Sequence, residues 1–141
     1  MNEKVNRLIR AALAKGACSG SDKVSDYKSL VWMLFSPQGR EFCEENNFPA
    51  LSDLEAIKAE VEPYGVFVNS GYVHRNNQPH IALMGDTEAT LEYSDVSQVY
   101  KIILMHGAKA KIKASNYAVL QITNIGGCKV EIEKDKTVVI L

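Results

Sequence analysis

The feature that most constrains the fold of this chain is an internal repeat in its C-terminal half. The segment IALMGDTEATLEYSD, which begins at Ile81, aligns with IILMHGAKAKIKASN, which begins 21 positions later at Ile102. A third copy begins at Ile122, a further 20 positions along, and runs into the stretch TVVIL. Repeats of this length are typical of solenoids, in which each copy forms one coil that stacks on its neighbours.

The residues inside each copy indicate strands rather than helices. Polar and apolar residues alternate, β-branched residues are frequent, and glycines and other turn residues separate the short runs. We therefore predict a parallel β-solenoid of about three to four coils over residues 63–141. Two alternatives remain open. A leucine-rich repeat has a similar period, but its LxxLxLxxN pattern is missing. An antiparallel β-sandwich or meander could place two strands and two turns in about 20 residues.

The charged residues of the repeats predict a specific register between coils. Lys109 and Lys113 alternate with apolar residues, so in a strand they share the outward face. Aligning the copies places Lys113 between Glu92 and Glu133 and places Lys109 beside Glu88, at the roughly 4.8 Å spacing of neighbouring strands. Each exposed pair is worth about 0.2–1 kcal/mol. The pairs therefore select the register, while the apolar interior supplies the stability.

The first 62 residues have helical periodicity, and the chain as a whole is predicted to be an α+β protein. Apolar residues recur at helical spacing from Val5 to Leu13, and Gly16 provides a stop signal. The next apolar segment, residues 27–35, contains Trp32. It is apolar on so many sides that we expect the tryptophan to be buried. We predict that residues 1–62 form a compact helical cap.

Two capping signals predict where further helices begin. Ser36 followed by Pro37 has the pattern of an N-cap with proline at the first helical position. This helix should end at the asparagines near Asn47. Ser52 and Glu55 have the spacing of a capping box, which predicts a short helix over residues 53–62.

The cysteines and the apolar segments indicate the cellular compartment. Cys18, Cys43 and Cys128 form no CxxC pair, and an odd number leaves one thiol unpaired, so we expect reduced thiols. Cys43 ends the string SPQGREFC, and we interpret it as a buried structural residue, because all three histidines lie in the other half of the chain. No segment approaches the roughly 20 apolar residues of a membrane span. We therefore expect a cytoplasmic protein that makes no membrane contact.

The charge distribution argues against nucleic-acid binding. The formal net charge is −1. Residues 1–40 carry seven basic and three acidic groups, whereas residues 41–62 carry one basic and seven acidic groups. The acidic segment would repel phosphates near the basic one. A solvated helix face, or polar contacts between the helices, explains these charges better.

No motif predicts catalysis, a metal or a cofactor. The histidines His74, His80 and His106 are not joined by a metal-binding spacing. His106 replaces Gly85 in the repeat, which indicates a turn, and an approach by Asp86 and Glu88 would give it acid–base partners. No nucleophile or oxyanion-binding motif accompanies these residues. We therefore predict no catalytic, metal-binding or cofactor-binding residues and favour a non-enzymatic protein.

Two resemblances extend this interpretation. Through SPQGREFC, the following NNFP and the LMxGAxAxI-type repeats, the chain resembles a family of small proteins from gut bacteria of the Bacteroidetes type, and this resemblance implies no particular activity. The repeats are also similar in architecture to those of bactofilins, bacterial β-helical scaffold proteins that polymerise end to end. The helical segment in front of the solenoid departs from the bactofilin pattern and argues against polymerisation.

The function predicted from these observations is a protein-interaction or scaffolding module that binds a protein partner or a second copy of itself. The last coil ends in Thr137, Val138, Val139, Ile140 and Leu141, and this apolar edge is expected to pair with another chain, most simply as a dimer. The alternative is a carbohydrate-binding or carbohydrate-active β-helix. It would need acidic and aromatic residues on one outer face, and the tyrosines expected to be at the surface are Tyr72, Tyr93, Tyr100 and Tyr117.

Overall fold

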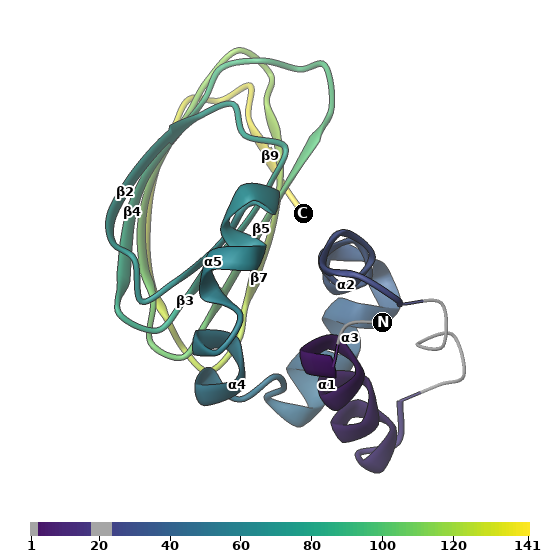
Figure 1. Ribbon diagram of the computed structural model, residues 1–141. Coiled ribbons are helices and arrows are strands. Elements are labelled where there is room, and N and C mark those ends of the chain that lie inside the picture. The colour runs from purple at the N-terminus through teal and green to yellow at the C-terminus, as the bar shows by residue number, and fades with distance from the viewer. Residues whose placement is uncertain (1–2, 18–23) are drawn as a thin grey trace. The chain divides into compact units, whose positions relative to one another are not determined.

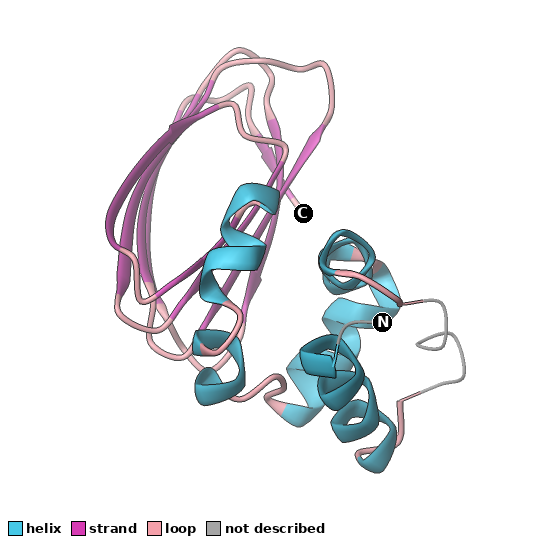
Figure 2. Cartoon of the chain, in the orientation of Figure 1, coloured by secondary structure: helices cyan, strands magenta, loops and turns pink. Residues whose placement is uncertain are grey.

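The computed structural model describes residues 3–17 and 24–141, and it divides into two compact units. The first unit extends to Val66 and the second comprises Phe67–Leu141. Figure 2 shows helices in the first part of the chain and strands from Val66 onward. The predicted α+β class is therefore confirmed.

The helical unit contains five α-helices and a short 3-10 helix within the described residues. Their bounds are α1 Glu3–Ala14, α2 Tyr27–Phe35, α3 Pro37–Asn46, α4 Leu51–Glu55, α5 Lys58–Val61 and the 3-10 helix Glu62–Tyr64. Helix α1 buries Val5, Leu8 and Ala12 on one face. Its Lys4 ammonium donates to the carbonyl oxygen of Ala56 at 3.0 Å and lies 3.6 Å from the Glu60 carboxylate. Polar contacts between helical elements were expected from the charge pattern.

The start of α3 agrees with the sequence prediction. Ser36 is the N-cap, and its hydroxyl oxygen accepts a hydrogen bond from the backbone N–H of Gly39 at 3.1 Å. The backbone of Gly39 lies close to the end of α2, since a Cβ atom at Gly39 would lie 1.8 Å from the carbonyl oxygen of Met33. The helix ends at Asn46, followed by Asn47 in the left-handed conformation that asparagine tolerates.

Trp32 was expected to be buried, and this expectation was wrong. Its side chain is 69% exposed, whereas Val31 and Phe35 are the buried residues of α2. Val31 and Phe35 are four positions apart and lie on one face of the helix. A helix of this length turns only one face inward, so an apolar segment can still expose its largest residue.

The predicted capping box at Ser52 was also wrong. Helix α4 begins at Leu51, and its N-cap Ala50 makes no side-chain hydrogen bond. The expected single helix is interrupted at Ile57, which leaves helical geometry with φ −119° and ψ 15° and is only 1% exposed. We infer that burying Ile57 outweighs the cost of breaking this short helix.

A capping box does occur at the start of α2. The Asp26 carboxylate accepts from the backbone N–H of Ser29 at 2.8 Å, and the Ser29 hydroxyl accepts from the backbone N–H of Asp26 at 3.1 Å. These hydrogen bonds lower the pKa of Asp26, the largest effect coming from the Ser29 side chain. The serine at the third helical position replaces the glutamate or glutamine of the usual motif.

The second unit is a parallel β-solenoid of about four turns (Figure 1). Successive strands alternate between two sheets, and each coil stacks on the preceding one. The five-stranded sheet has the order β1 Val66–Val68, β3 His80–Met84, β5 Val99–Met105, β7 Val119–Asn124 and β9 Val139–Ile140. The four-stranded sheet has the order β2 Gly71–Asn76, β4 Thr87–Tyr93, β6 Lys109–Ala114 and β8 Lys129–Lys134.

The parallel pairing confirms the predicted solenoid and excludes the antiparallel alternative. The second strand in each coil, in place of a helical return, excludes the leucine-rich alternative. The predicted register is also confirmed. Lys113 pairs in position with Glu92 on one side and with Glu133 on the other. Lys109 pairs with Glu88. The first coil is different, because Gly71 pairs with Thr87 only 16 positions away, and this shorter period was not found in the sequence.

Apolar columns fill the space between the two sheets. One column, from the four-stranded sheet, runs through Ala89, Ala110 and Val130. Another, from the five-stranded sheet, pairs Ile81 with Ile102. Full burial of one Leu, Ile or Val side chain contributes about 1.5–3 kcal/mol, so these columns supply most of the solenoid's stability.

Candidate functional site

One interior column shows that the two ends of the solenoid are chemically different. Position by position, the column runs from Arg75 through Leu91 and Ile112 to Ile132. Leu91 and Ile112 are buried, but Ile132 is 41% exposed. The column therefore begins with a cation and ends with an exposed apolar side chain.

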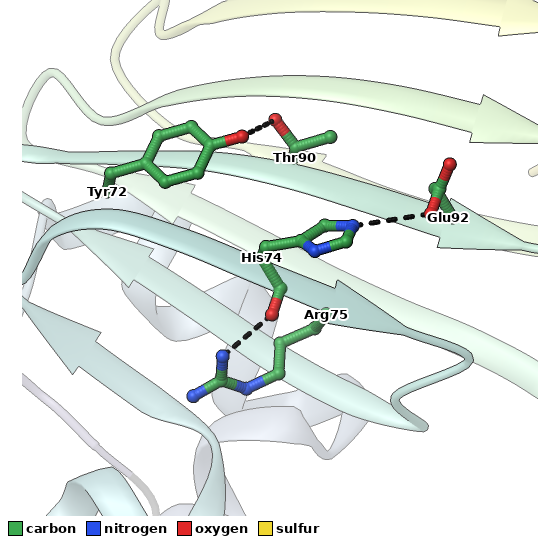
Figure 3. Close-up of polar contacts among 5 residues, drawn as sticks. All are labelled: Tyr72, His74, Arg75, Thr90 and Glu92. Atoms are coloured by element: carbon green, nitrogen blue, oxygen red, sulfur yellow. Dashed lines mark hydrogen bonds and ion pairs between the residues drawn. The ribbon is translucent and has the colours of Figure 1, made fainter.

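Arg75 covers the first coil. Its guanidinium carbon lies 4.9 Å from the centre of the Phe67 ring. Its Nη1 donates to the carbonyl oxygen of His74 at 2.7 Å (Figure 3). A guanidinium over an aromatic ring forms a favourable cation–π contact while the charge keeps access to water. At this end the interior is therefore covered by the Arg75 guanidinium, which stays accessible to water.

The opposite end is formed by β8, which has a neighbouring strand on one side only among the described strands. Lys129, Glu131 and Glu133 alternate along it with Val130 and Ile132. The first three continue the outward columns, and the two apolar residues continue the interior columns. The peptide groups on the free side of such a strand are available to another strand.

The five predicted self-association residues lie in and beside β9, where the structure separates them by exposure. Val139 and Leu141 are 49% and 63% exposed, whereas Val138 is buried. The Thr137 hydroxyl accepts from the backbone N–H of Tyr117 at 2.9 Å and donates to Asp135, and Ile140 packs partly buried against the core.

Among the described residues, strand β9 pairs with Val119 and Leu120 of β7 alone. It leaves residues 121–124 of β7 without a strand on this side within the described structure. The pairing of β8 with β6 was predicted, but neither Ile132 nor any other residue of β8 was among the predicted self-association residues. The signal was present, since Ile132 is the last member of the apolar column that aligning the repeats produces.

The outward face of the four-stranded sheet carries polar contacts between the first two coils. The Tyr72 hydroxyl and the Thr90 hydroxyl are 2.7 Å apart, and His74 Nε2 lies 3.3 Å from Glu92 Oε2 (Figure 3). Both members of the histidine–glutamate pair are about half exposed. These contacts join residues on adjacent strands and stabilise the stacking of the coils.

An open polar hollow of about 600 Å³ lies where the strands of this sheet end. Its lining includes Glu92, Lys113, Glu133, Lys134 and Asp135. The Thr137 side chain and backbone lower the pKa of Asp135 through hydrogen bonds, so this residue is a fixed anion at neutral pH. Three acids and two lysines line the hollow, so their formal charges nearly cancel.

Two of the four tyrosines expected at the surface are buried, which corrects the prediction. Tyr93 and Tyr100 are 2% and 1% exposed, and their rings pack with centroids 4.7 Å apart. Tyr93 is paired in register with Ala114, whose small side chain leaves room for the ring. Burial, followed by the nearby Tyr100, raises the pKa of the Tyr93 hydroxyl above its usual range. Tyr72 and Tyr117 are exposed, as expected.

Of the candidate acid–base residues, Asp86 and His106 lie in the turns that follow β3 and β5, and Glu88 lies in β4. His106 adopts a left-handed turn conformation with φ 57°, matching Gly85 with φ 66° one coil earlier, so the predicted turn is confirmed. Glu88 pairs with Lys109, and the backbone N–H of Asp86 donates to Asn69. Within residues 3–17 and 24–141, no group of three or more His, Cys, Asp or Glu side chains could hold a metal ion.

The helical unit contains an apolar cleft of about 400 Å³, and Cys43 is one of the residues that line it. Cys43 is 5% exposed, and burial raises the pKa of its thiol to about 12. A thiol with this pKa is protonated at neutral pH and is a poor nucleophile, which agrees with the structural role predicted for it. Cys128 is also buried, and Cys18 lies outside the described residues.

No described helix is long and apolar enough to cross a bilayer. Comparisons of the chain with protein-family models, curated proteins and solved structures give no significant match. The comparisons therefore do not support the expected membership of the gut-bacterial family. What the structure shares with bactofilins is the β-solenoid architecture alone.

Proposed function

We propose that this protein is a non-enzymatic interaction module that self-associates through the last coil of its solenoid. The observation that carries the proposal is Ile132, which is 41% exposed at the end of a column whose preceding members, Leu91 and Ile112, are buried. A chain that pairs with β8 would bury Ile132 as Ile112 is already buried. A partner chain packed against β8 would therefore continue the apolar interior of the solenoid.

Two further features support this surface as the docking site. On β9, in the facing sheet of the same last coil, Ile140 continues the interior column of Tyr100 and Leu120 and is only partly buried. The free backbone edge of β8 offers hydrogen bonds in addition to apolar contact. A partner strand would satisfy these peptide groups and exclude water from Ile132 in one step.

The first coil offers a poorer docking surface. A partner stacked there would have to cover the Arg75 guanidinium, which now lies over Phe67 at the edge of the interior. Removing a guanidinium from water without an anionic partner is costly. We therefore assign the interaction to the end formed by β8 and β9.

Light scattering coupled to size-exclusion chromatography tests the proposal from about 1 to 100 μM protein. We expect a dimeric mass that falls toward the monomer at the lowest concentrations, and a monomer for Ile132→Lys at all of them. Val96→Lys is the matched control, because Val96 is 62% exposed but lies outside the strands of the last coil. Circular dichroism confirms that both variants are folded. A wild-type monomer at every concentration, or equal dissociation by the Val96 variant, would contradict the proposal.

A further inference from the structure

We propose that the partner of β8 is β8 of a second copy, paired antiparallel about a two-fold axis that passes beside Glu131. This inference rests on the proposed self-association and adds the arrangement of the two chains. It follows from the order of charged and apolar residues on β8. It predicts a closed dimer rather than a filament, because a two-fold axis uses the same surface on both copies.

The faces of the strand restrict the registers that are possible. In an antiparallel pair, residues directly opposite each other point to the same face, so apolar residues must oppose apolar residues for the interior to continue. With Glu131 on the axis, Val130 of each copy lies opposite Ile132 of the other. The interior column is then extended through both copies.

The charges on the outward face agree with the same register. With Glu131 on the axis, Lys129 of each copy lies opposite Glu133 of the other, which gives two attractive pairs. Glu131 faces its own counterpart and gives one repulsive pair. Residues 129–133 of the two strands pair throughout.

The neighbouring registers are less favourable. An axis at Ile132 places Glu131 opposite Glu133 twice and sets the charged Lys134 against Val130 in the interior. An axis at Val130 leaves only residues 129–131 of the two strands paired and leaves Ile132 beyond the strand pairing. Registers shifted by one residue place charged side chains opposite apolar ones.

A head-to-tail stack is disfavoured by the first coil. Continuing the columns of one copy into the next would place Arg75 directly over Ile132 and bury its charge against an apolar side chain. Such a stack would also grow without limit, because each copy would keep one free end. The two-fold arrangement instead leaves Arg75 hydrated on both outer ends.

A charge exchange tests the register. Lys129→Glu and Glu133→Lys each replace two attractive pairs with two repulsive ones, so each should weaken dimerisation roughly tenfold. The double variant restores opposite charges and should return to within about threefold of wild type. Lys101→Glu is the control, because Lys101 lies on β5, inside the five-stranded sheet, and should leave dimerisation unchanged. Failure of the double variant to recover, while each single variant is folded, would overturn the register.

The residue on the axis gives a second test. Glu131→Gln removes the single repulsive pair and should tighten the dimer about two- to fivefold. In the monomer Glu131 pairs in position with Lys111, so the same change should slightly lower the thermal stability of the monomer. If Glu131 had only a structural role, Glu131→Gln would lower both the dimer affinity and the thermal stability of the monomer. That result would count against a two-fold axis at Glu131.

Cross-linking separates the inference from the proposal on which it rests. Glu131→Cys places two thiols across the axis and should give a covalent dimer under mild oxidation, whereas Lys129→Cys, whose counterpart is Glu133, should not. Wild type controls for the native cysteines. A protein that remains monomeric refutes the self-association itself. A dimer that forms without cross-linking at position 131 leaves the self-association standing and refutes this arrangement.

Discussion

Ile112 and Ile132 occupy paired positions on β6 and β8, yet Ile112 is 1% exposed and Ile132 is 41% exposed. The same residue type, in the same column and one coil apart, is thus a core residue in one place and a surface residue in the other. The difference arises because β6 has strands on both sides, whereas β8 pairs with β6 alone among the strands that the structure describes. It identifies the last coil as the part of the solenoid whose apolar interior is incompletely covered.

This difference predicts unequal effects of truncation on the stability of the monomer. Ile112→Ala should lower the free energy of unfolding by about 2–5 kcal/mol, because it opens a cavity in a packed interior. Ile132→Ala should cost less than about 1 kcal/mol, since much of its side chain is already in water. Chemical denaturation at the lowest practical protein concentration measures both values. Equal losses would show that Ile132 is as buried as Ile112.

Reversing the charge of Lys113 should destabilise the stack of coils. Lys113→Glu would place three carboxylates in one column with Glu92 and Glu133, at a cost of roughly 1 kcal/mol, and would lower the melting temperature. Lys101→Glu is the matched control, because Lys101 pairs in position with His80 and Gln121 and has no acidic neighbour in its column. An unchanged melting temperature for Lys113→Glu would argue against this register. High salt should reduce the effect.

Two serines in the helical unit should differ in their contribution to stability. Ser36→Ala removes the hydroxyl that accepts from Gly39 N–H and should cost about 1 kcal/mol. Ser52→Ala should change stability by less than about 0.5 kcal/mol, because Ser52 lies inside α4 and is not its N-cap. Urea denaturation monitored by circular dichroism compares the two variants. A larger loss of stability for Ser52→Ala than for Ser36→Ala would instead support the capping box that the sequence predicted at Ser52.

Cys43 should be unreactive in the folded protein and should make stability depend on alkaline pH. Burial raises its pKa to about 12, above the ordinary value of 9.0, so the unfolded chain loses the thiol proton first as pH rises. The stability associated with the protonated thiol is therefore complete below about pH 9 and decreases as pH increases from 9 toward 12.

Mass spectrometry after iodoacetamide treatment at pH 8 tests the reactivity of this thiol. Cys43 should be alkylated only after denaturation. Unfolding experiments from pH 8 to pH 11 test the linkage, with Cys43→Ala as the comparison. The variant loses side-chain packing at every pH but should lack this part of the alkaline decrease. Rapid alkylation of Cys43 in the native protein would contradict its burial.

Much of the solenoid could be predicted from the sequence, because a register inferred from two copies of the repeat can be checked against the third. The alignment of the copies that contain Glu92, Lys113 and Glu133 set both the period and the pairing. The first coil escaped detection because it is shorter: Gly71 and Thr87 are only 16 positions apart. Sequence periodicity cannot detect a coil whose turns have a different length.

The helical unit was less predictable, because its helices are short and local signals compete with packing. The signals at Ser36 and Pro37 agreed with the structure, since an N-cap is satisfied by residues within the same turn. The exposure of Trp32 and the burial of Ile57 depended instead on which residues of their helices faced the interior. An exposed Trp32 and a helix broken at Ile57 follow from contacts between segments that no local pattern contains.

The sequence by itself predicted the stacked coils and their charge register, because stacked copies of one pattern place equivalent residues at a fixed strand spacing. It left the antiparallel and leucine-rich alternatives open, and the structure decided between them. Only the tertiary structure decided which members of each column are covered. Tyr93 and Tyr100 are buried against each other, Arg75 lies over Phe67, and Ile132 remains exposed. Burial depends on the neighbours of a side chain in three dimensions, and the neighbours at the ends of a stack differ from those in its middle although the repeated pattern is the same.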